Sequence, residues 1–226
     1  MKRVLIILFA FSLIYADPSK YTVYFMGMPV VGVEMNENHV EFNGKDAVLF
    51  EFGARALSIV YYLYPVDNYY NTMLYKDHHE LISFSKEIDQ YGFIQNITAE
   101  SQNSMMYYNA DLYFDVTYHN IFSLLYAIKN NKVDKLLTHD FVLEAEGTFH
   151  KARLSIASEK DNIVKYSINL METQEDNEFL KKTDVFLENV FRDNAERYIW
   201  VDMDRNEIVR CKFKVGFISL NAYIEE

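Results

Sequence analysis

The residues best suited to chemistry form one cluster of imidazoles and carboxylates, at Asp77, His78, His79 and Glu80. Imidazole beside carboxylate is a ligand set that Zn, Ni and Cu use in proteins. Adjacent side chains at the start of a strand point to opposite faces. A site that used both histidines would therefore need a turn and a third ligand from elsewhere. We expect a solvated turn here and no metal site.

Nucleophilic and acid–base catalysis also lack a recognisable set of residues. The sequence has no GxSxG elbow, and Cys211, the only cysteine, lies in the alternating run RCKFKVGFISLNAYI, which is typical of a buried strand thiol. Carboxylate pairs such as Asp111 with Asp115 are typical of solvated faces in an acidic chain, because a catalytic pair needs a raised pKa. We predict no catalytic residue, no cofactor, and a protein that is not an enzyme.

Tyrosine is the residue type whose abundance points to a binding role. The chain has 18 Tyr and 17 Phe, and tyrosine joins an apolar ring to a polar tip that suits the wall of a wet cavity. Two interpretations are open: the rings line a cavity, or they form cross-strand pairs and pack on sheet faces. The candidate lining residues are Tyr61, Tyr62, Tyr107, Tyr113, Leu124 and Leu125.

The first sixteen residues, MKRVLIILFAFSLIYA, have the pattern of a cleaved secretory signal peptide. Lys2 and Arg3 form its positive region, an apolar run extends to Ile14, and Ala16 ends a small-residue cleavage site. The run is shorter than the roughly 20 residues of a spanning helix, so we expect no transmembrane span, and no cysteine follows it to carry a lipid. These features predict a periplasmic or exported protein, with residues 1–16 removed and 17–226 forming one domain.

The charge of the chain limits its partners. The formal net charge is -11 at pH 7, and such a surface repels phosphate backbones and anionic lipid headgroups. We therefore expect no nucleic acid partner, and any membrane contact should use apolar surface or a local cationic patch. A single cysteine excludes an intramolecular disulfide, so stability must come from packing.

Strands must position most of these residues, because aromatic and β-branched residues alternate in runs bounded by Asn, Asp and Gly. Asn43-Gly44, between HVEF and DAVLFEF, predicts a type I′ hairpin turn, in which both central residues have positive φ. We expect strands over 69–75, 80–88 and 105–116, then from FVLEAEG to the C-terminus with DVFLENVF included and METQEDNEFLKKTD as a loop. In YTVYFMGMPVVGVEM, Gly27 and Pro29 predict a bulge or kink.

Two segments are predicted as helices. In 120–130, NIFSLLYAIKN, apolar residues follow helical spacing behind Asn120, which can cap the N-terminus. Residues 54–64 are ambiguous between strand and helix, and we favour one short helix that ends at Pro65. The expected fold is mainly β, a strongly curved antiparallel sheet or half-barrel with one or two helices on its concave side.

Four segments together resemble the DUF3108 family of exported bacterial proteins: YTVYFMGMPVVGVEM, LYPVDNYYNTMLY with ELISFSKEI, YFDVTYHNIFSLLYAIKN, and NEIVRCKFKVGFISLNAYIEE. The resemblance rests on Pro29 and Gly32, on Asp67 after Pro65, on Asp115 before the helix, and on Arg210 through Gly216. It covers most of residues 17–226, although DFVLEAEG is hard to align. It implies a curved sheet around a helix, similar to the half-barrels of periplasmic lipoprotein carriers, and no established activity.

The sequence thus predicts a non-catalytic exported protein whose curved sheet binds an apolar or amphipathic ligand, such as a lipid, an acyl chain or an envelope polymer. This prediction rests on fold analogy. An alternative is a cell-envelope module that binds another protein through a sheet edge or face, and a third is a hydrolase acting on envelope material. A continuous cavity of roughly 300 Å³ between the 120–130 helix and the sheet would favour the ligand, and a packed interior the protein partner.

Overall fold

One antiparallel sheet of 14 strands contains most of the residues described by the computed structural model, which are 17–77, 79–108, 112–176 and 183–225. Except for β8 and β9, strands adjacent in sequence pair with one another, and β1 (Ser19–Phe25) also pairs with β14 (Ile218–Ile224) in the middle of the sheet. The other strands are β2 (Met28–Phe42), β3 (Lys45–Ala56), β4 (Val66–Tyr75), β5 (Leu81–Gln90), β6 (Phe93–Gln102), β7 (Met105–Tyr108), β8 (Leu112–Asp115), β9 (Phe141–Ala145), β10 (Thr148–Lys160), β11 (Ile163–Asp176), β12 (Glu196–Asp202) and β13 (Glu207–Val215).

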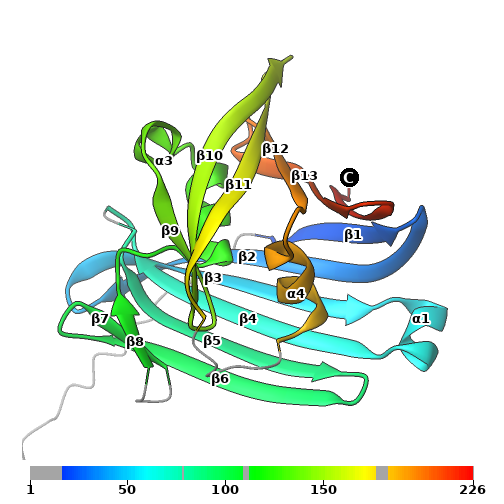
Figure 1. Ribbon diagram of the computed structural model, residues 1–226, viewed down its shortest axis with the longest axis horizontal. Coiled ribbons are helices and arrows are strands. Elements are labelled where there is room, and N and C mark those ends of the chain that lie inside the picture. Colours follow the sequence, from blue (N-terminus) through cyan, green and yellow to red (C-terminus); the bar gives the residue numbers. More distant parts are fainter. Residues whose placement is uncertain (1–16, 78, 109–111, 177–182, 226) are drawn as a thin grey trace, which may run out of the picture.

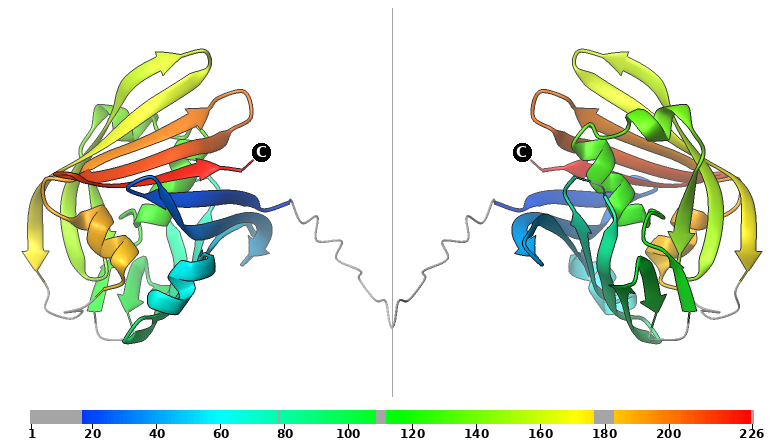
Figure 2. Two further views of the ribbon diagram at one scale, coloured as in Figure 1. Left: turned by 90° about the vertical axis from the view of Figure 1, so that its right-hand side faces the viewer. Right: turned by 90° about the vertical axis from the view of Figure 1, so that its left-hand side faces the viewer.

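The sheet is open, with β8 and β9 at its two edges, and it curls so that these edges approach each other (Figures 1 and 2). His119, which follows β8, forms a parallel bridge with Leu143 of β9. Tyr108 of β7 donates a hydrogen bond from Oη to Glu144 Oε2 over 3.0 Å. The twist of the strands produces such curling in large sheets. A few hydrogen bonds, and no continuous ladder, therefore link the two edges.

Helix α2 (Ile121–Lys129) packs inside the curled sheet against β3, β4 and β9 (Figure 2). Residues 121–128 are all buried, as expected of a helix that is largely apolar around its circumference. Asn120 begins the helix with a capping box: its side chain accepts from Ser123 N over 2.8 Å, and Ser123 Oγ accepts from Asn120 N. The helix predicted for 120–130 is confirmed.

The described residues contain three shorter helices: α1 (Ser58–Leu63), α3 (Asp134–Thr138) and α4 (Val185–Phe191). Helix α1 confirms the short helix favoured within 54–64, although residues 54–56 still belong to β3. The strand predicted for DVFLENVF is wrong, because this segment forms α4. Asp184 caps α4 by accepting hydrogen bonds from Phe186 N and Leu187 N, and this cap outweighs the β-branched composition.

The sequence predicted one of the first two hairpins and missed the other. The Asn43-Gly44 turn is confirmed, with φ of 52° and 73°. In YTVYFMGMPVVGVEM the chain reverses at Met26-Gly27 to form β1 and β2, and the register shifts next to Tyr24, so the predicted irregularity is a whole turn plus a bulge. Glycine suits this turn because Gly27 has a φ of 86°.

Three other strand boundaries also differ. The single strand predicted for 105–116 is wrong: β7 and β8 are two antiparallel strands, and the turn residues 109–111 lie outside the described ones. The predicted loop METQEDNEFLKKTD begins as strand, since β11 extends to Asp176. Strand β6 was not predicted, because Ile97 and Ala99 are its only buried residues and most of the others are polar. The predicted signal peptide, residues 1–16, lies outside the described residues.

Aromatic rings gather around Phe122 of α2 in the interior. Its ring centroid lies 4.8 Å from that of Phe52, 4.9 Å from Tyr70, 6.0 Å from Phe186 and 6.1 Å from Phe84. Aromatic pairs at these separations stabilise the fold beyond the area that they bury. For these rings, packing is the interpretation that the structure supports.

Candidate functional site

An apolar cavity lies between α2, α4 and the concave face of the sheet. Its volume is about 120 Å³. Phe122 and Leu125 border it from α2, Phe186 from α4, and inward-facing residues of six strands complete the wall. The strand residues are Tyr21, Val23, Val33, Met35, Phe52, Ala54, Tyr70, Ile208, Cys211, Phe213, Leu220 and Ala222. The cavity lies in the space between the helix and the sheet that separates the ligand interpretation from the protein-partner one, and it is smaller than the roughly 300 Å³ that would favour a ligand.

The six candidate lining residues are dispersed over the fold. Leu125 lines the cavity, and Leu124 is fully buried in the core. Tyr61 and Tyr62 are exposed on α1 and line no part of the interior, because α1 connects β3 to β4 beyond the end of the sheet. Tyr107 is half-buried on β7, and the side chain of Tyr113 lies outside the described ones.

Cys211 is a passive part of the cavity wall. Burial raises the pKa of its thiol to about 12, so the thiol stays protonated and is a weak nucleophile. Among the side chains that the structure describes, no group of three or more His, Cys, Asp or Glu residues could hold a metal ion. Within the same residues no helix is both long enough and apolar enough to cross a bilayer.

A buried ionic cluster holds α4 beside the cavity. Lys86 of β5 has a fully buried side chain and forms ion pairs with Glu146, in the β9–β10 turn, and with Asp184, the cap of α4. The distance from Lys86 Nζ to Asp184 Oδ2 is 3.2 Å. Asp184 therefore has two roles: it caps α4, the helix that carries Phe186, and it pairs with the charge of Lys86. Because Lys86 is closed to solvent, we assign it a structural role.

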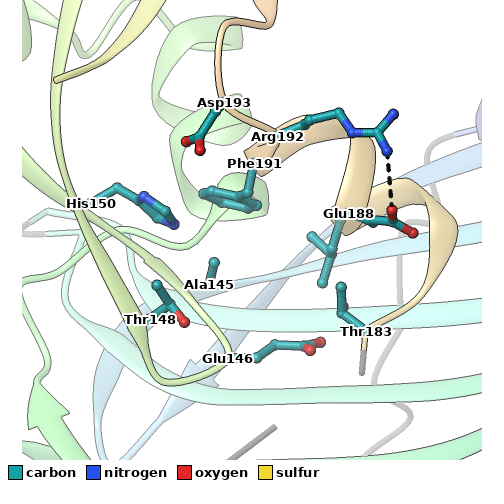
Figure 3. Close-up of a pocket in the computed structure, with 10 residues that line it drawn as sticks. Ala145, Glu146, Thr148, His150, Thr183, Glu188, Phe191, Arg192 and Asp193 are labelled. Atoms are coloured by element: carbon teal, nitrogen blue, oxygen red, sulfur yellow. Dashed lines mark ion pairs between the residues drawn. The ribbon is translucent and has the colours of Figure 1, made fainter. Parts of the chain in front are cut away.

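A polar pocket of about 360 Å³ lies on the other side of α4 (Figure 3). Glu146, Thr148 and His150 face it from the β9–β10 hairpin, and Phe191 and Arg192 from the end of α4. The guanidinium of Arg192 pairs with Glu188 over 3.6 Å. Helix α4 thus separates a charged pocket from an apolar cavity.

Sequence reasoning missed the ionic cluster, although β5 carries a signal for it. Strand alternation puts Lys86 on the same face as Phe84 and Ile88, both of which are buried. A lysine on an apolar strand face requires a buried partner. Its partners, Glu146 and Asp184, lie far along the chain, and only the fold brings them together.

Glu144 is another buried acid, and it should make stability depend on pH. Burial raises its pKa from 4.5 to about 8, although Gly147 N and Tyr108 Oη donate hydrogen bonds to it. The folded protein then keeps a proton that the unfolded chain has already lost. The free energy of unfolding should therefore fall by about 1.4 kcal/mol per pH unit as pH rises between the two values.

The interval between pH 6.5 and pH 8 isolates Glu144 from the buried His119. Burial lowers the pKa of His119 from 6.5 to about 4. Protonation of His119 in the unfolded chain therefore lowers the free energy of unfolding as pH falls below 6.5, and has no effect above that value. Urea unfolding of the wild type and of Glu144→Gln across this interval tests the prediction. The Gln variant should show the shallower slope, and equal slopes would show that Glu144 is already ionised in the folded protein.

Comparison with known proteins gives a distant structural similarity. No protein family model and no curated protein sequence matches the chain. A solved structure that is similar is the crystal structure of a β-barrel-like protein of the domain of unknown function DUF1849 from Brucella abortus. The alignment has a TM-score of 0.48 and 7% sequence identity, and it covers 94% of this chain and 98% of that one.

Proposed function

We propose that the protein is a non-catalytic exported binding protein that takes the apolar part of an amphipathic molecule, such as an acyl chain, into the cavity between α2, α4 and the sheet. The observation that carries this proposal is the composition of the cavity wall. Every lining side chain is apolar or aromatic, and the only polar atoms on them are the hydroxyls of Tyr21 and Tyr70 and the thiol of Cys211. Removing apolar surface from water gains roughly 25 cal/mol per Å², so such a wall favours hydrocarbon.

The cavity volume limits the ligand to a small apolar group. A cavity of about 150 Å³ in another protein binds benzene or xenon, and this one has about 120 Å³. It therefore suits one ring or a short stretch of acyl chain. The rest of an amphipathic ligand would lie outside the cavity.

The same volume favours a second candidate, a cell-envelope module that binds another protein. Pockets for drug-sized ligands usually have at least about 300 Å³, and the apolar cavity is smaller. In this alternative, α2 and its aromatic neighbours fill the interior to hold the sheet in shape. The partner would then use an outer surface.

A cavity-filling substitution distinguishes the two candidates. Ala222 lines the cavity from β14, and Ala222→Leu adds three carbon atoms to that space. We expect the affinity for primary alcohols from hexanol to dodecanol, measured by native mass spectrometry and calorimetry, to fall about tenfold or more, at roughly 0.8 kcal/mol for each displaced methylene.

The matched control is Thr22→Leu, which adds a similar side chain on the opposite face of β1, where Thr22 Oγ1 bonds Glu225. This variant should bind the alcohols as the wild type does. If the wild type binds none of the alcohols, or if Ala222→Leu binds them equally well, the ligand proposal fails and the protein-binding candidate takes its place.

A further inference from the structure

Four turns gather at one end of the strands, on the right-hand side of Figure 1. They are the β1–β2 turn, helix α1 between β3 and β4, the β5–β6 turn, and the β13–β14 turn. Backbone hydrogen bonds connect neighbouring turns: Met26 N donates to Ser219 O, and Tyr91 N donates to Pro65 O. We call these four turns together the apolar rim.

Large apolar side chains stand exposed on each turn of the apolar rim. The exposed fraction is 62% for Met26, 85% for Tyr62, 66% for Tyr91 and 83% for Phe217. Most of the exposed large hydrophobic residues in the described chain lie on the apolar rim or directly beside it. An apolar surface of this kind, gathered and not scattered, marks an interaction site.

The apolar rim carries no charge in a chain that is strongly acidic overall. The segments 26–31, 57–65, 91–94 and 215–218 contain no Asp, Glu, Lys or Arg, although the chain has a net charge of -11. The charges that flank α1 on its two strands, Arg55 and Asp67, pair with each other over 2.9 Å. The turns at the opposite end of the strands are polar instead: they contain Asn43-Gly44, Asn103-Ser104 and residues 203–206.

We propose that the apolar rim docks on the surface of a lipid bilayer made of zwitterionic or uncharged lipids. Tyrosine at the tips suits the boundary between headgroups and acyl chains, because its ring is apolar and its hydroxyl stays hydrated. The lack of charge in the rim matches a neutral surface, and the acidic remainder of the chain opposes docking on anionic headgroups. Because the four turns lie at the same end of the strands, they can enter the membrane–water interface together.

The docking proposal stands apart from the cavity proposal. It rests on exposed turns, and the cavity could be empty without affecting it. The two features are nevertheless adjacent: Val23 and Leu220 line the cavity and lie next to the turns that carry Met26 and Phe217. Docking through the apolar rim would bring the bilayer close to the apolar cavity.

A tryptophan reporter tests docking directly. The single native tryptophan, Trp200, lies on β12 near the end of the strands opposite the apolar rim, and the Arg210 guanidinium lies over its ring at 4.5 Å. In a Trp200→Tyr background, Tyr62→Trp places the reporter on the apolar rim. We expect vesicles of brominated phosphatidylcholine to quench the rim reporter strongly and to leave Trp200 of the wild type nearly unquenched. The rim and control variants described next both keep residues 1–16, so a difference between them cannot come from insertion of that segment.

Charge variants give the quantitative arm of the test. In the reporter chain, Tyr61→Glu with Phe217→Glu should weaken vesicle binding at least about tenfold, since two aromatic side chains lose their burial. The control His39→Glu with Gln102→Glu adds the same charge at exposed positions away from the rim and should bind as the reporter chain does. Adding phosphatidylglycerol should weaken binding, and salt should restore it.

Three results would overturn the proposal. The first is an unquenched rim reporter. The second is equal quenching of Trp200, which would mean nonspecific adsorption. The third is self-association in sedimentation that the rim variant abolishes without any vesicle binding, which would assign the rim to a second copy of the chain. A cavity that binds alcohols beside an unquenched rim would leave the ligand proposal standing.

Discussion

Lys86→Met is expected to lower the free energy of unfolding by about 3–5 kcal/mol, the usual cost of leaving a buried charge without its partner. The substitution removes the cation that faces Asp184 and Glu146, which are both buried. Burial already raises the pKa of Glu146, while the Lys86 charge lowers it. Without the lysine, Glu146 can regain stability by taking up a proton. Urea unfolding at neutral pH measures the loss.

The matched control for this prediction is Lys20→Met. Lys20 forms an exposed pair with Glu34 over 3.8 Å, and exposed pairs contribute about 0–1 kcal/mol. A similar loss in both variants would mean that the buried cluster does not stabilise α4 against the sheet. The Lys86 variant should also recover part of its stability at acid pH, where Glu146 is neutral.

Phe122→Ala is expected to cost about 3–5 kcal/mol, the range found when a buried phenylalanine is truncated. The ring of Phe122 is buried and contacts aromatic rings from β3, β4, β5 and α4. It also forms part of the cavity wall. The truncation should therefore enlarge the cavity, and longer alcohols should bind to this variant better than to the wild type and restore part of the lost stability.

Phe217→Ala is the control for the phenylalanine prediction. Phe217 is exposed on the apolar rim, and substitutions at such positions usually change stability by less than about 0.5 kcal/mol. Thermal unfolding of both variants with and without decanol checks the two effects. If decanol stabilises Phe122→Ala no more than the wild type, the space vacated by the ring is not continuous with a ligand site.

Local signals made the central helix and one hairpin predictable from sequence. Asn120 caps the helix with its own side chain, and Asn43-Gly44 supplies the two positive φ angles of the turn. Both features depend on residues close together in the chain. The mainly β, antiparallel character of the fold follows likewise from alternation along single strands.

The site could be predicted only in part, because its geometry depends on distant segments. Tyr61 and Tyr62 have the composition of cavity residues, yet α1 carries them beyond the end of the sheet. DVFLENVF has strand composition, yet the Asp184 cap and the contact of Asp184 with Lys86 hold it as a helix. No local pattern reports how far the sheet curls, and the curl sets both the volume of the cavity and the turns that share the apolar rim.

The measurement that tests ligand binding in the interior most directly is a set of nuclear Overhauser effects between bound decanol and the side chains of the protein. We predict contacts from the alcohol chain to Leu125, Phe186 and Ala222, which line the cavity from α2, α4 and β14. Contacts confined to Tyr62 and Phe217 on the apolar rim, or no contacts at all, would contradict binding inside the sheet.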